Sequence, residues 1–331
     1  MDAHPPLEIY HDPLAVPAAR RGSVVTFGNF DGVHLGHAGL VGRARELAGE
    51  RPVLAVTFEP HPVTILAPHR APQRLTTPVD KFHLLITAGA DAVLVLDTAH
   101  GLLGTEAEDF VRRVVWEALR PLHIVEGPTF GFGRGRAGNI ETLRAAGAQF
   151  GFGVEVVEPL RIDLGPPEGI QAVSSSLVRT LLQRGDVERA ACCLGRPYAI
   201  CGPVVSGAGR GRTLGYPTIN VEHGQLQLPG EGVYAGRATL GTRRSAAAIS
   251  IGSRPTFKGA GDAPGSETGG PRIVLEAFLL DGAGDHYGSE ARVELIARLR
   301  DQQTFASPEM LAGQIGRDVA ETRSIVDRAA S

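Results

Sequence analysis

GNFDGVHLGH, residues 28–37, is the stretch of this sequence that decides the fold. The residues before it, 23–27, are mostly β-branched and aromatic and predict a strand, while apolar residues at helical spacing over 40–48 predict a helix. A turn from a strand into a helix presents free backbone N–H groups and the positive end of the helix dipole to an anion. Glycine lets the backbone come close to that anion. We therefore predict a phosphate site at this turn.

Two histidines, His34 and His37, stand at the entrance of the predicted helix. Imidazole groups can stabilise charge that develops on a phosphoryl group. The alternative is an ordinary turn with two solvated histidines. The HxGH spacing directly after a Gly-rich turn favours phosphate binding over that alternative.

The length and composition limit the class of protein. A chain of 331 residues predicts two domains, and a net charge of -3 gives no basic field for nucleic acid or an anionic membrane. Cys192, Cys193 and Cys201 match neither a disulfide framework nor a zinc site, so we expect free thiols in a reducing cytosol. The first residues show no signal-peptide pattern, and no apolar run has membrane-spanning length. We expect a cytoplasmic protein.

The first half of the chain alternates strands and helices. Apolar runs predict strands at 53–58, 92–96 and 122–125, and helical spacing predicts helices at 81–88 and 107–119. This pattern indicates an α/β fold with a parallel sheet that is covered on both faces. Ligands of such sheets bind at the carboxyl ends of the strands, where GNFDGVHLGH begins.

The pattern changes near residues 185–186. Short β segments follow at 200–205, 232–240, 245–251, 273–280 and 291–297, punctuated by Gly and Pro, which predicts a small barrel. The tail, 308–329, carries an apolar stripe and predicts an amphipathic helix on the barrel. A Gly-rich loop at 259–271 receives no role. We expect domains at 1–186 and 187–331.

Two further segments of the first half are candidate sites. Ser174, Ser175 and Ser176 precede a predicted helix that carries Arg179, and such hydroxyls with a guanidinium suit either an anion or an ordinary helix cap. Phe130 and Phe132 lie among glycines and predict a flexible aromatic edge for a flat ring.

The second half contains GAGRGRTLGYPTIN, residues 207–220. Its glycines and arginines, Gly209, Arg210, Gly211 and Arg212, suit a loop that wraps phosphates. Thr218 and Asn220 share one face of a strand, so a hydroxyl and an amide oxygen can coordinate one Mg²⁺. The alternative is a Gly-rich hairpin with solvated arginines.

These motifs, in this order, resemble the bacterial bifunctional riboflavin kinase/FAD synthetase family, over nearly the whole chain. The resemblance implies a Rossmann-like nucleotidyltransferase domain followed by a small flavokinase β-barrel with a C-terminal helix. It also implies riboflavin, FMN and ATP as substrates, with Mg²⁺ in both halves. Residues 57–62, TFEPHP, resemble a segment that lines the flavin and ATP cleft and make His61 a candidate. Arg74 and Lys81 also match the family, although they read as an ordinary helix start.

In the first half, the resemblance implies that the phosphate of FMN attacks the α-phosphorus of ATP and that pyrophosphate leaves. His34 and His37 are then expected at the reacting phosphates. Gly28 and Gly36 would allow close approach, and Asn29 and Asp31 would orient the turn or the metal. Ser174, Ser175 and Arg179 would hold the pyrophosphate, as in the family's Ser-Ser-Thr-x-x-Arg segment.

In the second half, GRGRTLGYPTIN resembles the riboflavin kinase signature, with Thr218 and Asn220 on the metal and nucleotide positions. Glu276 matches the family's catalytic glutamate and would take the proton of the ribityl 5′-hydroxyl. The sequence departs from the family at Thr129 (Asn or Asp there), Ser250 (often Asn) and Phe278 (often His).

Three other functions stay open from the sequence. The chain could be mainly an FAD synthetase with a weakened kinase half, a flavin- or nucleotide-binding regulator, or a nucleotidyltransferase that acts on nucleic acid. The intact motifs disfavour the second and the charge disfavours the third. We expect no nucleic-acid partner and no membrane, and the oligomeric state is left undetermined by the sequence.

Overall fold

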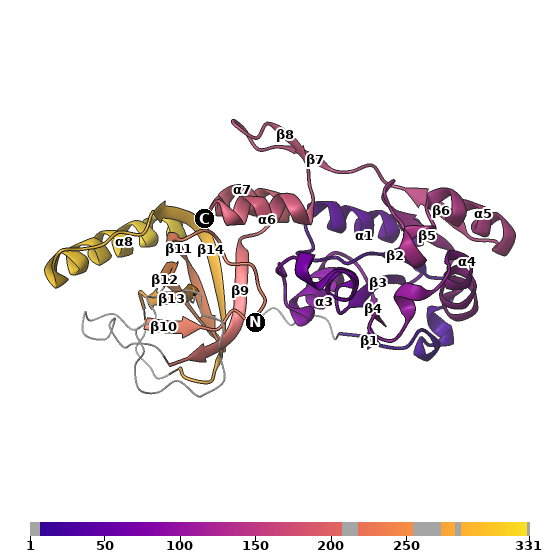
Figure 1. Ribbon diagram of the computed structural model, residues 1–331, viewed down its shortest axis with the longest axis horizontal. Helices are drawn as coiled ribbons and strands as arrows, with labels where there is room; N and C mark the ends of the chain where they lie inside the picture. The colour runs from indigo at the N-terminus through magenta and orange to yellow at the C-terminus, as the bar shows by residue number, and fades with distance from the viewer. Residues whose placement is uncertain (1–6, 207–217, 254–272, 282–285, 330–331) are drawn as a thin grey trace. The chain divides into compact units, whose positions relative to one another are not determined.

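The computed structural model describes residues 7–206, 218–253, 273–281 and 286–329. The chain divides into two compact units, residues 1–175 and 176–331 (Figure 1). The division falls at the start of helix α6 (Ser175–Gln183), and α7 (Val187–Leu194) follows in the second unit. The sequence-based boundary after residue 186 stays a prediction.

A six-stranded sheet forms the centre of the first unit. Its strands pair in parallel in the order β1-β4-β3-β2-β5-β6. The predicted parallel sheet is confirmed, and two short outer strands join the three predicted ones and the strand before the turn. The strands are β1 (Ile9–Tyr10), β2 (Val24–Phe27), β3 (Val53–Glu59), β4 (Ala92–Asp97), β5 (His123–Glu126) and β6 (Gly153–Val156).

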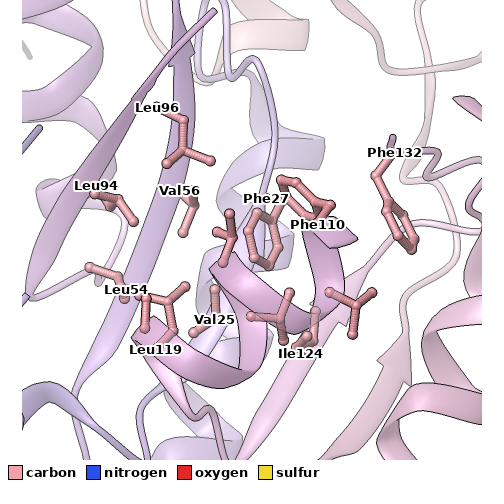
Figure 2. Close-up of a cluster of buried hydrophobic side chains, with 14 of the residues drawn as sticks. Val25, Phe27, Leu54, Val56, Leu94, Leu96, Phe110, Leu119, Ile124 and Phe132 are labelled. Carbon is pink, nitrogen blue, oxygen red and sulfur yellow. The ribbon is translucent and has the colours of Figure 1, made fainter. Parts of the chain in front are cut away.

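Two buried clusters cover the two faces of this sheet. Successive strand residues point to opposite sides, so consecutive residues belong to different clusters. Val25 and Leu54 belong to one cluster, and their neighbours Val24 and Val53 belong to the other. Figure 2 shows the first cluster, in which Phe27 and Phe110 lie close to one another among aliphatic side chains. This double burial explains why the strands are apolar throughout.

Helices supply the cover of the sheet. The predicted helix at 107–119 is confirmed as α4 followed by a π-helical segment, and the predicted helices at the turn and at 81–88 are confirmed as α1 and α3 (Figure 1). Their bounds are α1 (Leu35–Ala48), α2 (Pro62–Leu66), α3 (Pro78–Thr87), α4 (Ala107–Phe110), η5 (Val111–Leu119) and α5 (Ile140–Phe150), with short 3-10 turns η1 (Pro13–Ala15), η2 (Ala18–Arg20), η3 (Pro68–Arg70), η4 (Leu102–Gly104) and η6 (Arg134–Arg136). A two-stranded antiparallel hairpin, β7 (Arg161–Asp163) with β8 (Ile170–Ala172), extends from the unit in Figure 1.

The strand order places the candidate site. Strand β2 has β3 on one side and β5 on the other, so the chain winds in opposite directions from β2. The carboxyl ends of strands at such a switch point are the usual ligand site of open α/β sheets. GNFDGVHLGH leaves β2 at this end.

The second unit is a closed antiparallel barrel in the order β10-β13-β12-β11-β14-β9. Its strands are β9 (Tyr198–Val205), β10 (Thr218–Val221), β11 (Gly232–Leu240), β12 (Arg243–Ser253), β13 (Ile273–Leu279) and β14 (Glu290–Arg300). The predicted barrel is confirmed. The predicted terminal helix is α8 (Pro308–Arg328), which packs against β11, β12 and β14. Its buried stripe also contains Asp318, whose Oδ2 lies 2.7 Å from the Arg300 guanidinium.

The Gly-rich loop at 259–271 lies outside the described residues. Within the part of the chain that the structure describes, no helix is both long and apolar enough to cross a membrane.

Candidate functional site

The two histidines of the turn lie together at the start of α1. His34 is the N-cap of α1, and its Nδ1 accepts a hydrogen bond from the His37 N–H at 3.3 Å. The two rings stack with centroids 3.6 Å apart, and Phe30 meets the His37 ring edge-on at 5.2 Å. Because Nδ1 of His34 accepts a hydrogen bond, a neutral His34 carries its hydrogen on Nε2. The structure thus brings both imidazoles to the helix end that the sequence predicts for phosphate.

Asp31 ties the turn to the segment of residues 75–76. It is only 7% exposed, and its carboxylate accepts hydrogen bonds from the Leu75 N–H at 2.9 Å and the Thr76 N–H at 3.2 Å. The Thr76 hydroxyl lies 3.3 Å from the Gly32 N–H, which donates to it. The sequence left two roles for Asp31, the turn or the metal. These bonds favour the turn.

The backbone of Asn29 rests on a buried charge network that the sequence did not reveal. The Asn29 carbonyl accepts from the Thr57 hydroxyl at 3.2 Å and from Lys81 Nζ at 3.4 Å. Lys81 Nζ in turn lies 2.6 Å from the Glu59 carboxylate, which also binds Arg74 at 2.7 Å. Sequence reasoning read Lys81 as part of an ordinary helix start. The sequence signal for this network is a lysine among the apolar residues of the helix, since a buried lysine needs a charged partner.

The ionisation of this network follows from its surroundings. Burial raises the pKa of Glu59, but the hydrogen bonds from Arg74 and Lys81 outweigh burial and lower it overall. Burial lowers the pKa of Lys81, against the hydrogen bond with Glu59. The carboxylate is therefore ionised at neutral pH and anchors both cations beneath the turn.

The serine segment reaches the same turn. The Ser175 hydroxyl donates to the Asp31 carbonyl at 2.8 Å. A Cβ on Gly36 would lie 3.1 Å from the His34 ring and 3.6 Å from the Val173 carbonyl, so a side chain there would crowd the histidine. Two motifs about 140 residues apart therefore meet within the first unit. Arg179 lies on α6 in the second unit, and its predicted role at the pyrophosphate stays a prediction.

Phe130 and Phe132, the predicted aromatic edge, pack on the core: Phe132 belongs to the first buried cluster and Phe130 packs against it. Phe132 is 6% exposed, stacks on Phe130 at 5.5 Å and lies 5.6 Å from Phe110 (Figure 2). Phe130 is half-buried and lies 6.1 Å from Phe27. A flavin role for these two side chains remains a prediction, and any flavin contact would have to be made by rings that already pack on the core.

His61 follows the end of strand β3 and caps the next helix. Its Nδ1 accepts from the Val63 N–H at 3.2 Å and caps the short helix α2. A role in flavin binding stays a prediction for this residue.

In the barrel, strand register brings the kinase candidates together. Asn220 of β10 pairs directly with Glu276 of β13, and Glu276 pairs with Ser250 of β12. Thr218 pairs with Phe278 on the same strand pair. Directly paired residues of neighbouring strands share a face, so these side chains lie opposite to buried Ile219, Leu275 and Ala277. Ser250 Oγ accepts from Gln302 Nε2 at 3.0 Å.

The metal candidates have suitable chemistry. The Thr218 hydroxyl and the Asn220 amide oxygen are hard oxygen donors, which Mg²⁺ prefers. They stand two residues apart on β10 and therefore project to one face. Among the described residues, no group of three or more His, Cys, Asp or Glu side chains could hold a metal. Gly209, Arg210, Gly211 and Arg212 lie outside the described residues.

Comparisons with known proteins agree with both halves. A family model for FAD synthetase matches residues 16–167, and a model for riboflavin kinase matches residues 194–326. A bifunctional riboflavin kinase/FMN adenylyltransferase of Escherichia coli K12 is 36% identical over 309 residues, covering 92% of this chain and 93% of that protein. Proteins of the same name from Pseudomonas fluorescens and Bacillus subtilis are 37% and 32% identical, covering 92% and 95% of this chain and 93% and 96% of theirs.

A solved structure shows the same fold over nearly the full length. It is titled a macrolide-efflux protein from Streptococcus pneumoniae, is 27% identical, and superposes with a TM-score of 0.80 over 95% of this chain and 98% of that one.

Proposed function

We propose that the two reactions of this chain run at two separate sites. The premise is that the chain belongs to the bifunctional riboflavin kinase/FMN adenylyltransferase family. The chain phosphorylates riboflavin to FMN and adenylylates FMN to FAD, with ATP as the donor in both reactions. We assign the adenylylation to residues 1–186 and the phosphorylation to residues 187–331. The observation that carries this assignment is that the turn of residues 28–37 has its supporting contacts within the first unit, whereas Asn220 and Glu276 pair within the barrel.

In the first unit, the start of α1 is the site of adenylyl transfer. The FMN phosphate attacks the α-phosphorus of ATP, and pyrophosphate leaves. His34 and His37 donate hydrogen bonds to the phosphoryl oxygens, together with the N–H groups at the start of α1. No covalent intermediate is needed, so positioning and charge stabilisation carry the catalysis. The network of Asp31, Lys81 and Glu59 supports this by holding the turn.

In the second unit, Glu276 is the general base. It takes the proton of the ribityl 5′-hydroxyl as that oxygen attacks the γ-phosphate of ATP. Thr218 and Asn220 would hold Mg²⁺, which neutralises phosphate charge when bound. The direct pairing of Asn220 with Glu276 supports this assignment, because it sets the base beside the nucleotide position.

Complementation between two single variants tests the proposal. His37→Ala should convert riboflavin to FMN and stop there, whereas Glu276→Gln should convert supplied FMN to FAD but leave riboflavin unchanged. A mixture of the two proteins with riboflavin, ATP and Mg²⁺ should produce FAD, measured by chromatography. If each variant loses both activities, or the mixture makes no FAD, the two-site assignment is wrong.

We further propose that both reactions take place in the cytoplasm, on small molecules and without nucleic acid. The bacterial origin of the named relatives and the net charge of -3 support this. A weakened kinase half is a rival raised by Ser250 and Phe278. Comparing FAD formation from riboflavin with that from FMN measures its extent.

A further inference from the structure

A buried glutamate, Glu126, ends strand β5, and its side chain reaches the end of the neighbouring strand β2 beside the candidate site of the first unit. It is the last residue of β5 and is 2% exposed. The mechanism above does not use it. A buried carboxyl group needs a partner or must become neutral, so its surroundings call for an explanation.

The sheet ladder stops just before Glu126. Strands β2 and β5 have two registered pairs, Val24 with His123 and Val25 with Ile124, whereas β2 pairs with β3 as far as Phe27. On the β3 side, the Gly28 N–H donates to the Val56 carbonyl at 2.9 Å. On the β5 side, the Phe27 N–H donates to Glu126 Oε1 at 2.5 Å. A side chain therefore continues the ladder where the two backbones separate.

Burial favours the neutral form of the Glu126 carboxyl group. Burial raises the pKa of Glu126 well above its ordinary value, and the hydrogen bond from the Phe27 N–H opposes that change only in part. Within the part of the chain that the structure describes, the Phe27 N–H is its one hydrogen-bond partner, and no cation pairs with it. The Phe27 N–H needs only an acceptor, and the carbonyl oxygen of a neutral carboxyl group supplies one.

The two residues joined by this bond begin the two loops of the site. Phe27 directly precedes the turn of residues 28–37, and Glu126 directly precedes the loop that carries Phe130. The rings of Phe27 and Phe130 are 6.1 Å apart, so the end of β2 also contacts the loop after β5 through these side chains. The bond lies at the switch point between β2 and β5, and ligands of open α/β sheets usually bind at the carboxyl ends of such strands.

We infer that Glu126 is a positioning residue for FMN adenylylation: as a neutral hydrogen-bond acceptor, it holds the end of β2, and with it the phosphate turn, at a set distance from the loop after β5. The inference rests on the proposed role of the turn. It requires an acceptor of this length and no charge. A misplacement of about 1 Å at a reacting group lowers the rate by about 10²-fold.

Three substitutions test the inference. Glu126→Leu, which keeps the bulk and removes the acceptor, should lower kcat for FMN adenylylation by about 10²-fold with KM near the wild-type value. Glu126→Gln, which keeps a neutral acceptor of the same length, should retain near wild-type kcat. Glu155→Leu on the adjacent strand β6 is the matched control, because Glu155 makes a half-exposed ion pair with Arg43, and such pairs contribute little to stability.

Two readouts separate positioning from simple instability. The riboflavin kinase activity of the same polypeptide should stay unchanged in all three variants. Hydrogen exchange of the Phe27 amide should be slow in the wild type and in Glu126→Gln and faster in Glu126→Leu. A Gln variant that folds but loses adenylylation would overturn the inference, because a charge would then be needed. Wild-type kcat in Glu126→Leu would also overturn it.

The inference and the proposed function fail in different ways. If His37→Ala abolishes adenylylation while Glu126→Leu does not change it, only the role of Glu126 is wrong. If His37→Ala and Glu126→Leu both leave kcat unchanged, the turn is not the site and both proposals fall.

Discussion

In the first unit, side chains from distant parts of the chain hold the site, whereas in the barrel the register of two paired strands sets Asn220 beside Glu276. Asp31 accepts hydrogen bonds from Leu75 and Thr76, and Ser175 donates to the Asp31 carbonyl. In the barrel, Asn220 and Glu276 are direct neighbours across two antiparallel strands. A loop site depends on its supporting contacts, while a site on paired strands depends on the backbone ladder. Substitutions of supporting residues should therefore lower activity more in the first unit than in the barrel.

The largest expected effect is in the barrel, at the base itself. Glu276→Gln should lower riboflavin phosphorylation by about 10²–10⁴-fold, because the amide cannot accept the proton. Adenylylation of supplied FMN should stay at the wild-type rate. The measurement is FMN and FAD formation from separate substrates. Equal loss of both activities would mean that the two units do not work as independent sites.

The next largest effect is at the turn. His37→Ala should lower FAD formation from FMN by about 10²–10³-fold, the scale for losing one donor to the transition state. His100→Ala is the control, because His100 is an exposed histidine of the same unit and pairs with Asp97. Steady-state rates of both variants give the comparison. Near-normal turnover in His37→Ala would remove the histidines from the proposed chemistry.

A support of the turn should have a smaller effect, on stability. Glu59→Gln should destabilise the first unit by about 1–3 kcal/mol at neutral pH, because Lys81 stays buried without a carboxylate partner. The pKa of Glu59 is lowered in the folded state, so its contribution is present above the ordinary carboxyl pKa and is lost as the pH falls through the folded value. The difference between variant and wild type should narrow in acid.

Denaturant unfolding of the variant and of the wild type at neutral and acidic pH measures this difference. An unchanged difference across that pH range would show that Glu59 does not ionise within the network.

The smallest effect is expected next to the base in the barrel. Ser250→Ala removes a hydrogen bond of 3.0 Å from the exposed Gln302 and leaves the pairing of Ser250 with Glu276 intact. Riboflavin phosphorylation should fall by about 2–10-fold, the range for one ordinary hydrogen bond. A loss as large as that of Glu276→Gln would show that side-chain contacts, and not register, align the barrel site.

Local patterns were enough to predict much of the fold. The apolar runs at 53–58 and 92–96 became central parallel strands because both faces of the sheet are covered, and Gly-punctuated segments became the barrel. The outer strands β1 and β6 were not predicted. Short strands at sheet edges carry little pattern of their own, and their pairing partners lie far away in the sequence.

The candidate site was predicted only in part. The turn of residues 28–37 and the pair Asn220 and Glu276 come from motifs. Phe132 was predicted as an aromatic edge, yet its ring packs on Phe110 in the core. Glycine-rich loops read as flexible in a sequence, but an apolar ring is buried wherever the fold offers a surface, because that removes it from water.

The sequence by itself determined where a strand gives way to a helix and which residues carry phosphate chemistry, since glycine conformation, helix capping and side-chain periodicity act over a few residues. Only the tertiary structure decided that Glu126 meets the Phe27 N–H and that Lys81 lies on Glu59 beneath Asn29. Those partners are separated by 99, 22 and 52 residues. Contacts over such separations depend on how the strands of the whole sheet are arranged, and a local sequence pattern does not contain that information.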